Sequence, residues 1–156
     1  MCIELLVVVA ILLIIAAIAI PAMMNSIRSG RESATASTLR TLNTAETSYY
    51  NTYGSVFAAQ VTALAGDPAT CATGAVSSTA ACEIDNAFAT ALSKASYTYT
   101  RTATPTTFLW IATPANGLLS GRRDFCVIQG GIVHASALGT VGSITDAASC
   151  ASAPAL

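Results

Sequence analysis

An unbroken run of sixteen apolar residues, from residue 5 to residue 20, stands near the start of the chain, and Pro21 closes it. In a helix, which rises about 1.5 Å per residue, the run covers roughly 24 Å, and residues 22–24 extend it to about 30 Å, the depth of a bilayer's hydrocarbon core. Glu4 is the single charged side chain in front of it. We predict a hydrophobic helix over residues 1–24, which must be buried in a membrane or among other apolar helices.

The pattern then becomes that of an amphipathic helix over residues 25–53. Four apolar side chains recur at steps of three, seven and four residues, which places them on one helix face: Leu39, Leu42, Tyr49 and Tyr53. Gly54 follows as a C-cap glycine would. We therefore predict one helix from about residue 2 to residue 53, kinked or loosened at Pro21, because proline removes a backbone hydrogen bond.

Glu46 lies within that apolar face, where an unpaired carboxylate is costly. Two kinds of partner are open, a residue of the same chain or a neighbouring subunit. Arg28 and Glu32 are four residues apart and are spaced for a weak ion pair along the helix surface.

Residues 54–156 read as a globular head with three parts. They are a variable loop at 54–95, an antiparallel sheet at 97–136 and a C-terminal tail at 137–156 that we expect to be irregular. The sequence thus predicts an α+β fold, in which the long N-terminal helix packs on a C-terminal antiparallel sheet of three or four strands. The apolar face of the helix is the expected cover for that sheet.

Local signals place the elements of the head. Asp67-Pro68 marks a turn, and residues 83–94 favour one short helix. Gly130-Gly131 indicates a tight hairpin. Alternation and β-branched content predict strands at residues 97–101, 106–112, 124–129 and 132–135.

The five cysteines of the chain indicate the redox state of the compartment that holds the head. Cys2 stands alone at the tip of the hydrophobic helix, and it can be a buried thiol, an intermolecular crosslink or an acyl site. The other four cysteines lie in the head: Cys71, Cys82, Cys126 and Cys150. Their spacing is not that of a metal site, so we expect two disulfides and an oxidising compartment. Four cysteines allow three pairings. We favour one bond that closes the short loop between residues 71 and 82 and one that ties the tail at residue 150 to residue 126.

Charge and motifs argue against several functions. Charged residues make up 10% of the chain and the net charge is −1, so no basic patch is available for dedicated nucleic-acid binding. His134 is the single histidine, and the nucleophile and phosphate-loop motifs of common enzymes are missing from the sequence, so we expect neither enzyme activity nor a cofactor. His134 is expected to lie on a strand in a structural role. Residues 122–124 are expected to form a solvated turn rather than an anion site. The tyrosines at 49, 50 and 53 are expected to lie in the core rather than to form an electron path.

The segment Ile3-Glu4-Leu5-Leu6-Val7-Val8-Val9-Ala10-Ile11, continuing through Ala16-Ala17-Ile18-Ala19-Ile20 to Pro21, resembles the mature N-terminus of type IV pilins and pseudopilins. The likeness is close over about 20 residues; beyond residue 25 only the order of elements is similar. It implies the major structural pilin of an extracellular helical filament, made of identical subunits and serving adhesion, twitching motility or uptake. Asp124 and Asp146 are isolated acids, which disfavours the calcium-binding pseudopilins of type II secretion.

The resemblance also implies how such a chain is processed and assembled. A prepilin peptidase would remove a short basic leader, and the new terminus, Met1, would be N-methylated. The chain would wait in the inner membrane, with its head outside the cytoplasm, for the pilus assembly machinery. Glu4 would meet the terminal amine of an adjacent subunit during assembly. Physics supports a special role for Glu4, because an acid inside hydrocarbon costs several kcal/mol. The alternative is that the Glu4 carboxylate lies in the headgroup layer and only stabilises the N-terminus of the helix.

Three other interpretations stay open. They are a pseudopilin of a type II secretion system, a monomeric single-span anchored surface protein, and a cleaved secretory signal peptide. Arg28, Arg31 and Arg40 follow the apolar run and by the positive-inside rule favour a cytoplasmic head. A cytoplasmic head conflicts with the expected disulfides. The basic leader of a pilin-like precursor would balance the arginines that follow the apolar run, so we favour an extracytoplasmic head.

Overall fold

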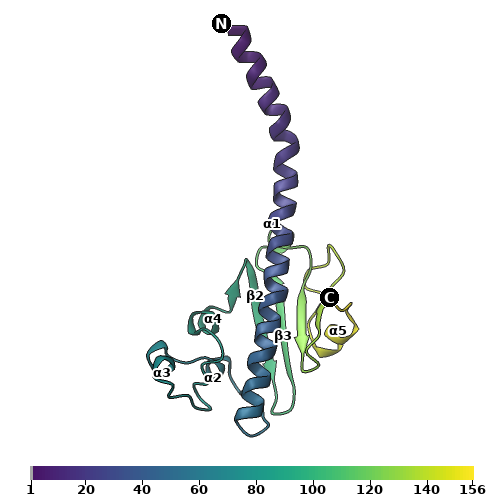
Figure 1. The fold of residues 1–156 in the computed structure, drawn as a ribbon. Helices are drawn as coiled ribbons and strands as arrows, with labels where there is room; N and C mark the ends of the chain where they lie inside the picture. Colours follow the sequence, from purple (N-terminus) through teal and green to yellow (C-terminus); the bar gives the residue numbers. More distant parts are fainter. Residues whose placement is uncertain (1) are drawn as a thin grey trace.

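The computed structural model describes residues 2–156, with side chains from residue 3 onward. Met1, the predicted methylation site, lies outside the described residues. One helix, α1 (Cys2–Thr52), is 51 residues long, which corresponds to about 77 Å. Figure 1 shows that its first half projects from the head while its second half lies on the sheet. The predicted α+β class, with a long N-terminal helix on an antiparallel sheet, is confirmed.

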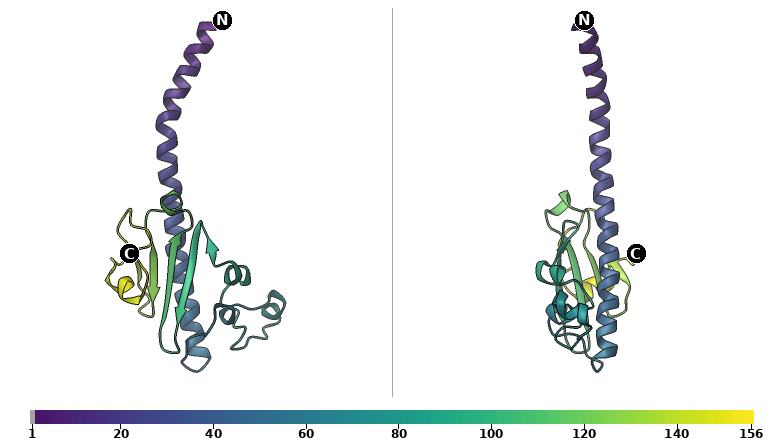
Figure 2. Two further views of the ribbon diagram at one scale, coloured as in Figure 1. Left: turned by 180° about the vertical axis from the view of Figure 1, so that it is seen from behind. Right: turned by 60° about the vertical axis from the view of Figure 1, so that its left-hand side comes forward.

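Pro21 lies inside α1, and the helix continues through it. Its missing N–H leaves the carbonyl of Ala17 without a helical donor. The axis curves gradually along the projecting half, as the left view of Figure 2 shows. The local effect expected at Pro21 therefore takes the form of curvature within one continuous helix.

The sheet is an antiparallel meander in which each strand pairs with the next along the chain. It has five strands, where three or four were predicted, and the additional strand is a two-residue one at the start. The strands are β1 (Ser93–Lys94), β2 (Tyr97–Ala103), β3 (Phe108–Pro114), β4 (Phe125–Ile128) and β5 (Val133–Ala135). Gly131 forms the turn between β4 and β5 with a φ of 76°, which favours glycine.

One face of the sheet packs against the second half of α1, as the helical pattern predicted. Leu39 and Leu42 are buried, and Tyr49 joins them in the main core. From the sheet, alternate residues of the strands complete this core: Tyr97, Tyr99, Trp110, Phe125 and Val127. The helix is thus the cover that the apolar face of the sheet requires.

The opposite face of β3 and β4 is buried as well. Leu109, Ile111 and Cys126 point to this side and pack against Ile144 and Cys150 of the tail. Burial on both faces explains why β3 is apolar at successive positions rather than at every second one.

The tail corrects the expectation of an irregular segment. It contains α5 (Ala147–Ser152), whose N-cap Asp146 accepts from the Ser149 N–H while the Ser149 hydroxyl accepts from the Asp146 N–H. This reciprocal capping stabilises a helix in a stretch of Ala and Ser that has no apolar periodicity. The hydrogen bonds from Ser149 also hold the pKa of Asp146 below its ordinary value.

Short helices occupy the variable loop and one sheet connection. They are α2 (Val61–Leu64), α3 (Pro68–Thr73), α4 (Asn86–Ala91) and the 3₁₀ turn η1 (Gly117–Leu119). Asp67 caps α3, whose first residue is Pro68, so the turn expected at Asp67-Pro68 is the start of a helix. Asp85 caps α4 in the same way. The helix predicted within residues 83–94 is confirmed only over its central six residues.

Two disulfides close the head, and both pairings are the favoured ones. Cys71 pairs with Cys82 across 11 residues, and Cys126 pairs with Cys150 across 24. The first closes the loop that carries α3, and the second fastens α5 to β4.

We predict that the wider disulfide contributes more to stability. In the loop-entropy model, losing the 24-residue closure of Cys126→Ala/Cys150→Ala costs about 3.5 kcal/mol, against about 3 kcal/mol for Cys71→Ala/Cys82→Ala. The second bond also buries Cys150 against the sheet, which widens the difference. Urea unfolding of the full chain in detergent measures both variants. An equal or smaller loss for the 126–150 variant would contradict the role of this bond as the clip of the tail.

Candidate functional site

The projecting half of α1, residues 3–27, is the largest exposed apolar surface of the described chain. Each of its Ile, Leu, Val and Met side chains is between 37% and 73% exposed. It is the one helix among the described residues that is long and apolar enough to cross a membrane, judged by length and composition. We call this segment the free half and residues 28–52 the packed half.

Glu4 is the single ionisable side chain of the free half. It lies 24 residues before Arg28, about 36 Å along the helix, so no side chain of the head can reach it. Cys2 lies in the same first turn, and its side chain is outside the described part. Glu4 therefore has no partner among the described residues, and an unpaired acid on an apolar helix is costly unless another group or water satisfies it.

Glu46 of the packed half is fully buried and is bound by the head of its own chain. Its carboxylate accepts from Arg101 Nε and Nη2 at 2.5 and 2.9 Å, and from Trp110 Nε1 at 2.9 Å. Arg101 also donates to the Ala58 carbonyl at 2.8 Å, which brings the loop after α1 into the cluster. The sequence left open whether Glu46 binds a residue of its own chain or a neighbouring subunit. In the structure it binds Arg101 of its own chain.

Arg101 could have been identified as that partner from the sequence. It follows Tyr97 and Tyr99 at steps of two, so it points to the same inward face of β2. A charge at an inward position opposite an inward Glu46 on the covering helix is the signal for a buried pair.

A second ion pair replaces the one expected along the helix. Glu32 accepts from Arg123 Nε at 2.9 Å and from the Arg122 N–H at 2.8 Å. It therefore binds the segment before β4 and not Arg28. Backbone and guanidinium donors on that segment satisfy both carboxylate oxygens of this nearly buried group, which Arg28 alone would not do.

Residues 122–124 are therefore only in part the solvated turn that their charges suggested, because Arg122 is exposed and Arg123 is half-buried but Asp124 is buried. Asp124 is buried, and its Oδ2 accepts from the N–H groups of Ser143 and Ile144. Its own N–H donates to Ser136 Oγ. Burial raises the pKa of Asp124 above its ordinary value, and the hydrogen bonds from the Ser143 and Ile144 segment oppose the shift. This short segment therefore joins the helix, the sheet and the tail.

The remaining candidates have structural surroundings. His134 Nδ1 lies 2.7 Å from the Ala153 carbonyl, on the tail side of β5. Tyr49 is buried and donates to the Ser78 carbonyl at 2.7 Å, while Tyr53 packs against it with ring centroids 4.8 Å apart. Tyr50 is half-buried against Phe57.

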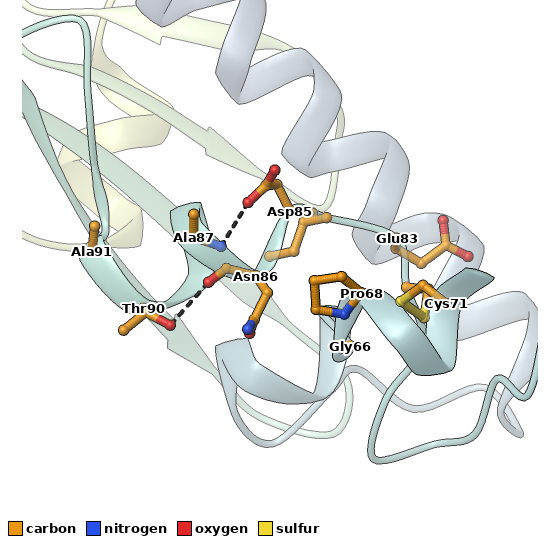
Figure 3. Close-up of a pocket in the computed structure, with 11 residues that line it drawn as sticks. Gly66, Pro68, Cys71, Glu83, Asp85, Asn86, Ala87, Thr90 and Ala91 are labelled. Atoms are coloured by element: carbon orange, nitrogen blue, oxygen red, sulfur yellow. Dashed lines mark hydrogen bonds between the residues drawn. A yellow bond between two sulfur atoms is a disulfide. The ribbon is translucent and has the colours of Figure 1, made fainter. Parts of the chain in front are cut away.

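A shallow depression of about 850 Å³ lies between α3 and α4, beside the disulfide of Cys71 (Figure 3). Its acids are already engaged: Asp85 accepts from the N–H groups that begin α4, and Glu83 accepts from Ser48 Oγ at 2.7 Å. Within the described residues no three His, Cys, Asp or Glu side chains gather as a metal site needs. The depression therefore carries no group that is poised for chemistry.

Comparisons with models of protein families, with curated proteins and with solved structures give no significant match for this chain.

We predict that removing the Glu46 carboxylate destabilises the fold strongly. Glu46→Leu leaves Arg101 buried without a counter-charge, and the expected loss in unfolding free energy is about 3 kcal/mol or more. Glu46→Leu/Arg101→Leu removes the unpaired charge and should recover a large part of that loss. Urea unfolding of the full chain in detergent, followed by Trp110 fluorescence, measures both. A double variant less stable than the single one would contradict this account.

We predict opposite pH dependences for two acids that form hydrogen bonds with the tail, Asp124 before β4 and Asp146 within the tail. Because the folded-state pKa of Asp124 is raised, its protonated form favours folding, so its contribution is present at low pH and is lost as pH rises through that pKa. The stability of the wild type minus that of Asp124→Asn should therefore fall as pH rises above the ordinary value of 3.8.

Asp146 is the matched control, because its folded-state pKa is lowered. Its contribution is present above the ordinary value of 3.8 and is lost as pH falls through the folded pKa. The difference between wild type and Asp146→Asn should therefore rise with pH up to the ordinary value of 3.8 and stay level above it. Thermal melts across pH measure both, and equal slopes for the two variants would contradict the assignment.

Proposed function

We propose that this chain is the structural subunit, a major pilin, of a type IV pilus-like extracellular filament. The observation that carries the proposal is Glu4, an acid with no partner among the described residues of its own chain, on a free half that is otherwise uncharged. In the filament the free halves of many copies would form the core, and the heads would tile the outside.

Burial of the free half is the driving force in this proposal. Fully burying one large aliphatic side chain is worth about 1.5–3 kcal/mol, so sixteen of them amount to tens of kcal/mol. A bilayer and a bundle of like helices can both supply that burial. Glu4 favours the bundle, because a positive terminal amine on a neighbour offsets the cost of the carboxylate and sets the axial stagger between copies.

The firm seating of the head supports a repeating assembly. The pairs Glu46–Arg101 and Glu32–Arg123 attach the sheet to α1 at two levels, fourteen residues or about 21 Å apart along the helix. A head held at one rotation about its helix can present the same surface in every copy, as a helical lattice requires.

The rest of the proposal follows the resemblance of residues 3–21. The chain would reside in the inner membrane with an extracytoplasmic head, where its two disulfides can persist. A prepilin peptidase would expose and methylate the terminus, and the pilus machinery would extract the free half into the filament. The work of the filament would be adhesion, motility or uptake, without reaction chemistry in the subunit.

We predict that Glu4→Ala and Glu4→Leu accumulate in the membrane but yield few filaments. Removing the carboxylate leaves residues 3–24 fully apolar, so membrane insertion is retained while the contact with a neighbouring amine is lost. The measurement is the amount of the chain in sheared surface fibres relative to the membrane fraction, in a host with the complete assembly machinery. We expect a reduction of at least about tenfold, the effect of 1.4 kcal/mol per subunit contact.

Leu5→Ala is the matched control, since it changes the adjacent residue and keeps the acid. Normal fibre yield from both Glu4 variants would remove the assembly role. Wild-type material that stays a single detergent-soluble species and never forms fibres would assign the chain instead to the monomeric anchored proteins.

A further inference from the structure

A basic and apolar pocket lies where the head meets the free half of α1. It has a volume of about 310 Å³ and is lined by Arg28, Leu118, Arg122, Leu138 and Gly139. Leu119 stands beside it at the end of η1. We call these six residues the junction rim.

The junction rim lies at the level where the apolar segment ends. Arg122 Nη2 donates to Oδ1 of Asn25, the first polar residue after the apolar run, at 2.6 Å. Arg28 is three residues further, about 4.5 Å along the axis. In Figure 2 the green turn that carries η1 is at the end of the head from which the free half projects. If a bilayer holds the free half, the rim faces the headgroup layer.

The polar groups of the rim are suited to an anion. Arg28 Nε is shielded from solvent and has no hydrogen-bond partner, which is costly for a charged donor. The nearby acid, Glu32, is bound by Arg123 and by the Arg122 N–H. Two guanidinium groups therefore line one small pocket without a carboxylate between them, and guanidinium forms strong paired bonds to phosphate oxygens.

The apolar groups of the rim are suited to a lipid surface rather than to a free anion. Leu119 and Leu138 are 66% and 63% exposed, the two highest values among the large apolar side chains of the head, and Leu118 is 52% exposed. Leucines interleaved with arginines at one surface are typical of segments that sit in the interfacial layer of anionic membranes.

We propose that the junction rim docks on the headgroups of anionic phospholipids, with a lipid phosphate between Arg28 and Arg122 and the three leucines in the interfacial layer. Docking would hold the head upright on the bilayer while the free half is still in the membrane. The inference rests on the membrane-resident stage of the proposed function and does not require a filament.

The test uses the full chain with Leu119→Trp, in vesicles whose lipids carry bromine on the acyl chains. Bromine quenches an indole that enters the interfacial layer, and Trp110 is fully buried, so the wild type supplies the background. Vesicles of phosphatidylcholine alone are compared with vesicles in which phosphatidylglycerol replaces part of it. We expect strong quenching that requires phosphatidylglycerol.

Two matched controls separate docking from tethering. Val76→Trp places the probe at a side chain of similar exposure, 53%, in the loop that contacts Tyr49, so it should stay unquenched. In the Leu119→Trp chain, Arg28→Gln or Arg122→Gln should raise the phosphatidylglycerol content at half-maximal quenching about fivefold each. Arg40→Gln removes the same charge roughly 18 Å further along α1 and should not change it.

Three results would overturn the proposal. Equal quenching in the two lipids would mean that the head is tethered and not docked. Loss of the phosphatidylglycerol effect on addition of inorganic phosphate at matched ionic strength would assign the pocket to free phosphate. A blue shift that grows with the protein-to-lipid ratio and needs no bromine would assign the rim to a second copy of the chain. Each readout is independent of fibre yield, so failure here and failure of the filament proposal are distinguishable.

Discussion

The buried carboxylate of Glu46 is the interaction on which the arrangement of helix and sheet depends. Three donors converge on it from the centre of the sheet, two from Arg101 and one from Trp110. An apolar helix face can slide or rotate on an apolar sheet at small cost, whereas a buried charge is satisfied in one register only. The seating of α1, and with it the direction in which the free half leaves the head, follows from this contact together with Glu32–Arg123.

Periodicity made much of the fold predictable. The helical repeat of Leu39, Leu42 and Tyr49 located the core face, and alternation located four of the five strands within a few residues. The two-residue β1 has no pattern of its own, because such a strand is defined by its pairing to β2. The favoured disulfide pairing is confirmed. The short loop between residues 71 and 82 and the need to hold the tail at residue 150 both favoured the same pairing.

The errors arose where long-range contacts override local polarity. Residues 122–124 carry three charges in succession, yet Asp124 is buried and Arg123 is half-buried, because the helix and the tail bond to them, while Arg122 stays exposed. The tail forms α5 by capping and by a disulfide rather than by an apolar stripe, so the Asp146-to-Ser149 spacing was its single local signal. For the candidate site, Glu4 and the free half were evident from the sequence, whereas the junction rim required segments distant in the chain to be placed beside Asn25.

The edges of the sheet matter for a protein that is held at high local density. At one side β1 offers only two residues, and at the other β5 has three, whose outer hydrogen bonds are taken by the C-terminal residues: Ala135 N donates to the Pro154 carbonyl, and the Leu156 N–H donates to Val133. The border at β5 leaves no row of free peptide groups, and at the other border β1 and the bond from the Tyr99 N–H to the Leu92 carbonyl cover the start of β2, which leaves only residues 100–103 open to a neighbour's strand. Crowded copies can therefore touch through their side chains without fusing into a continuous cross-β aggregate.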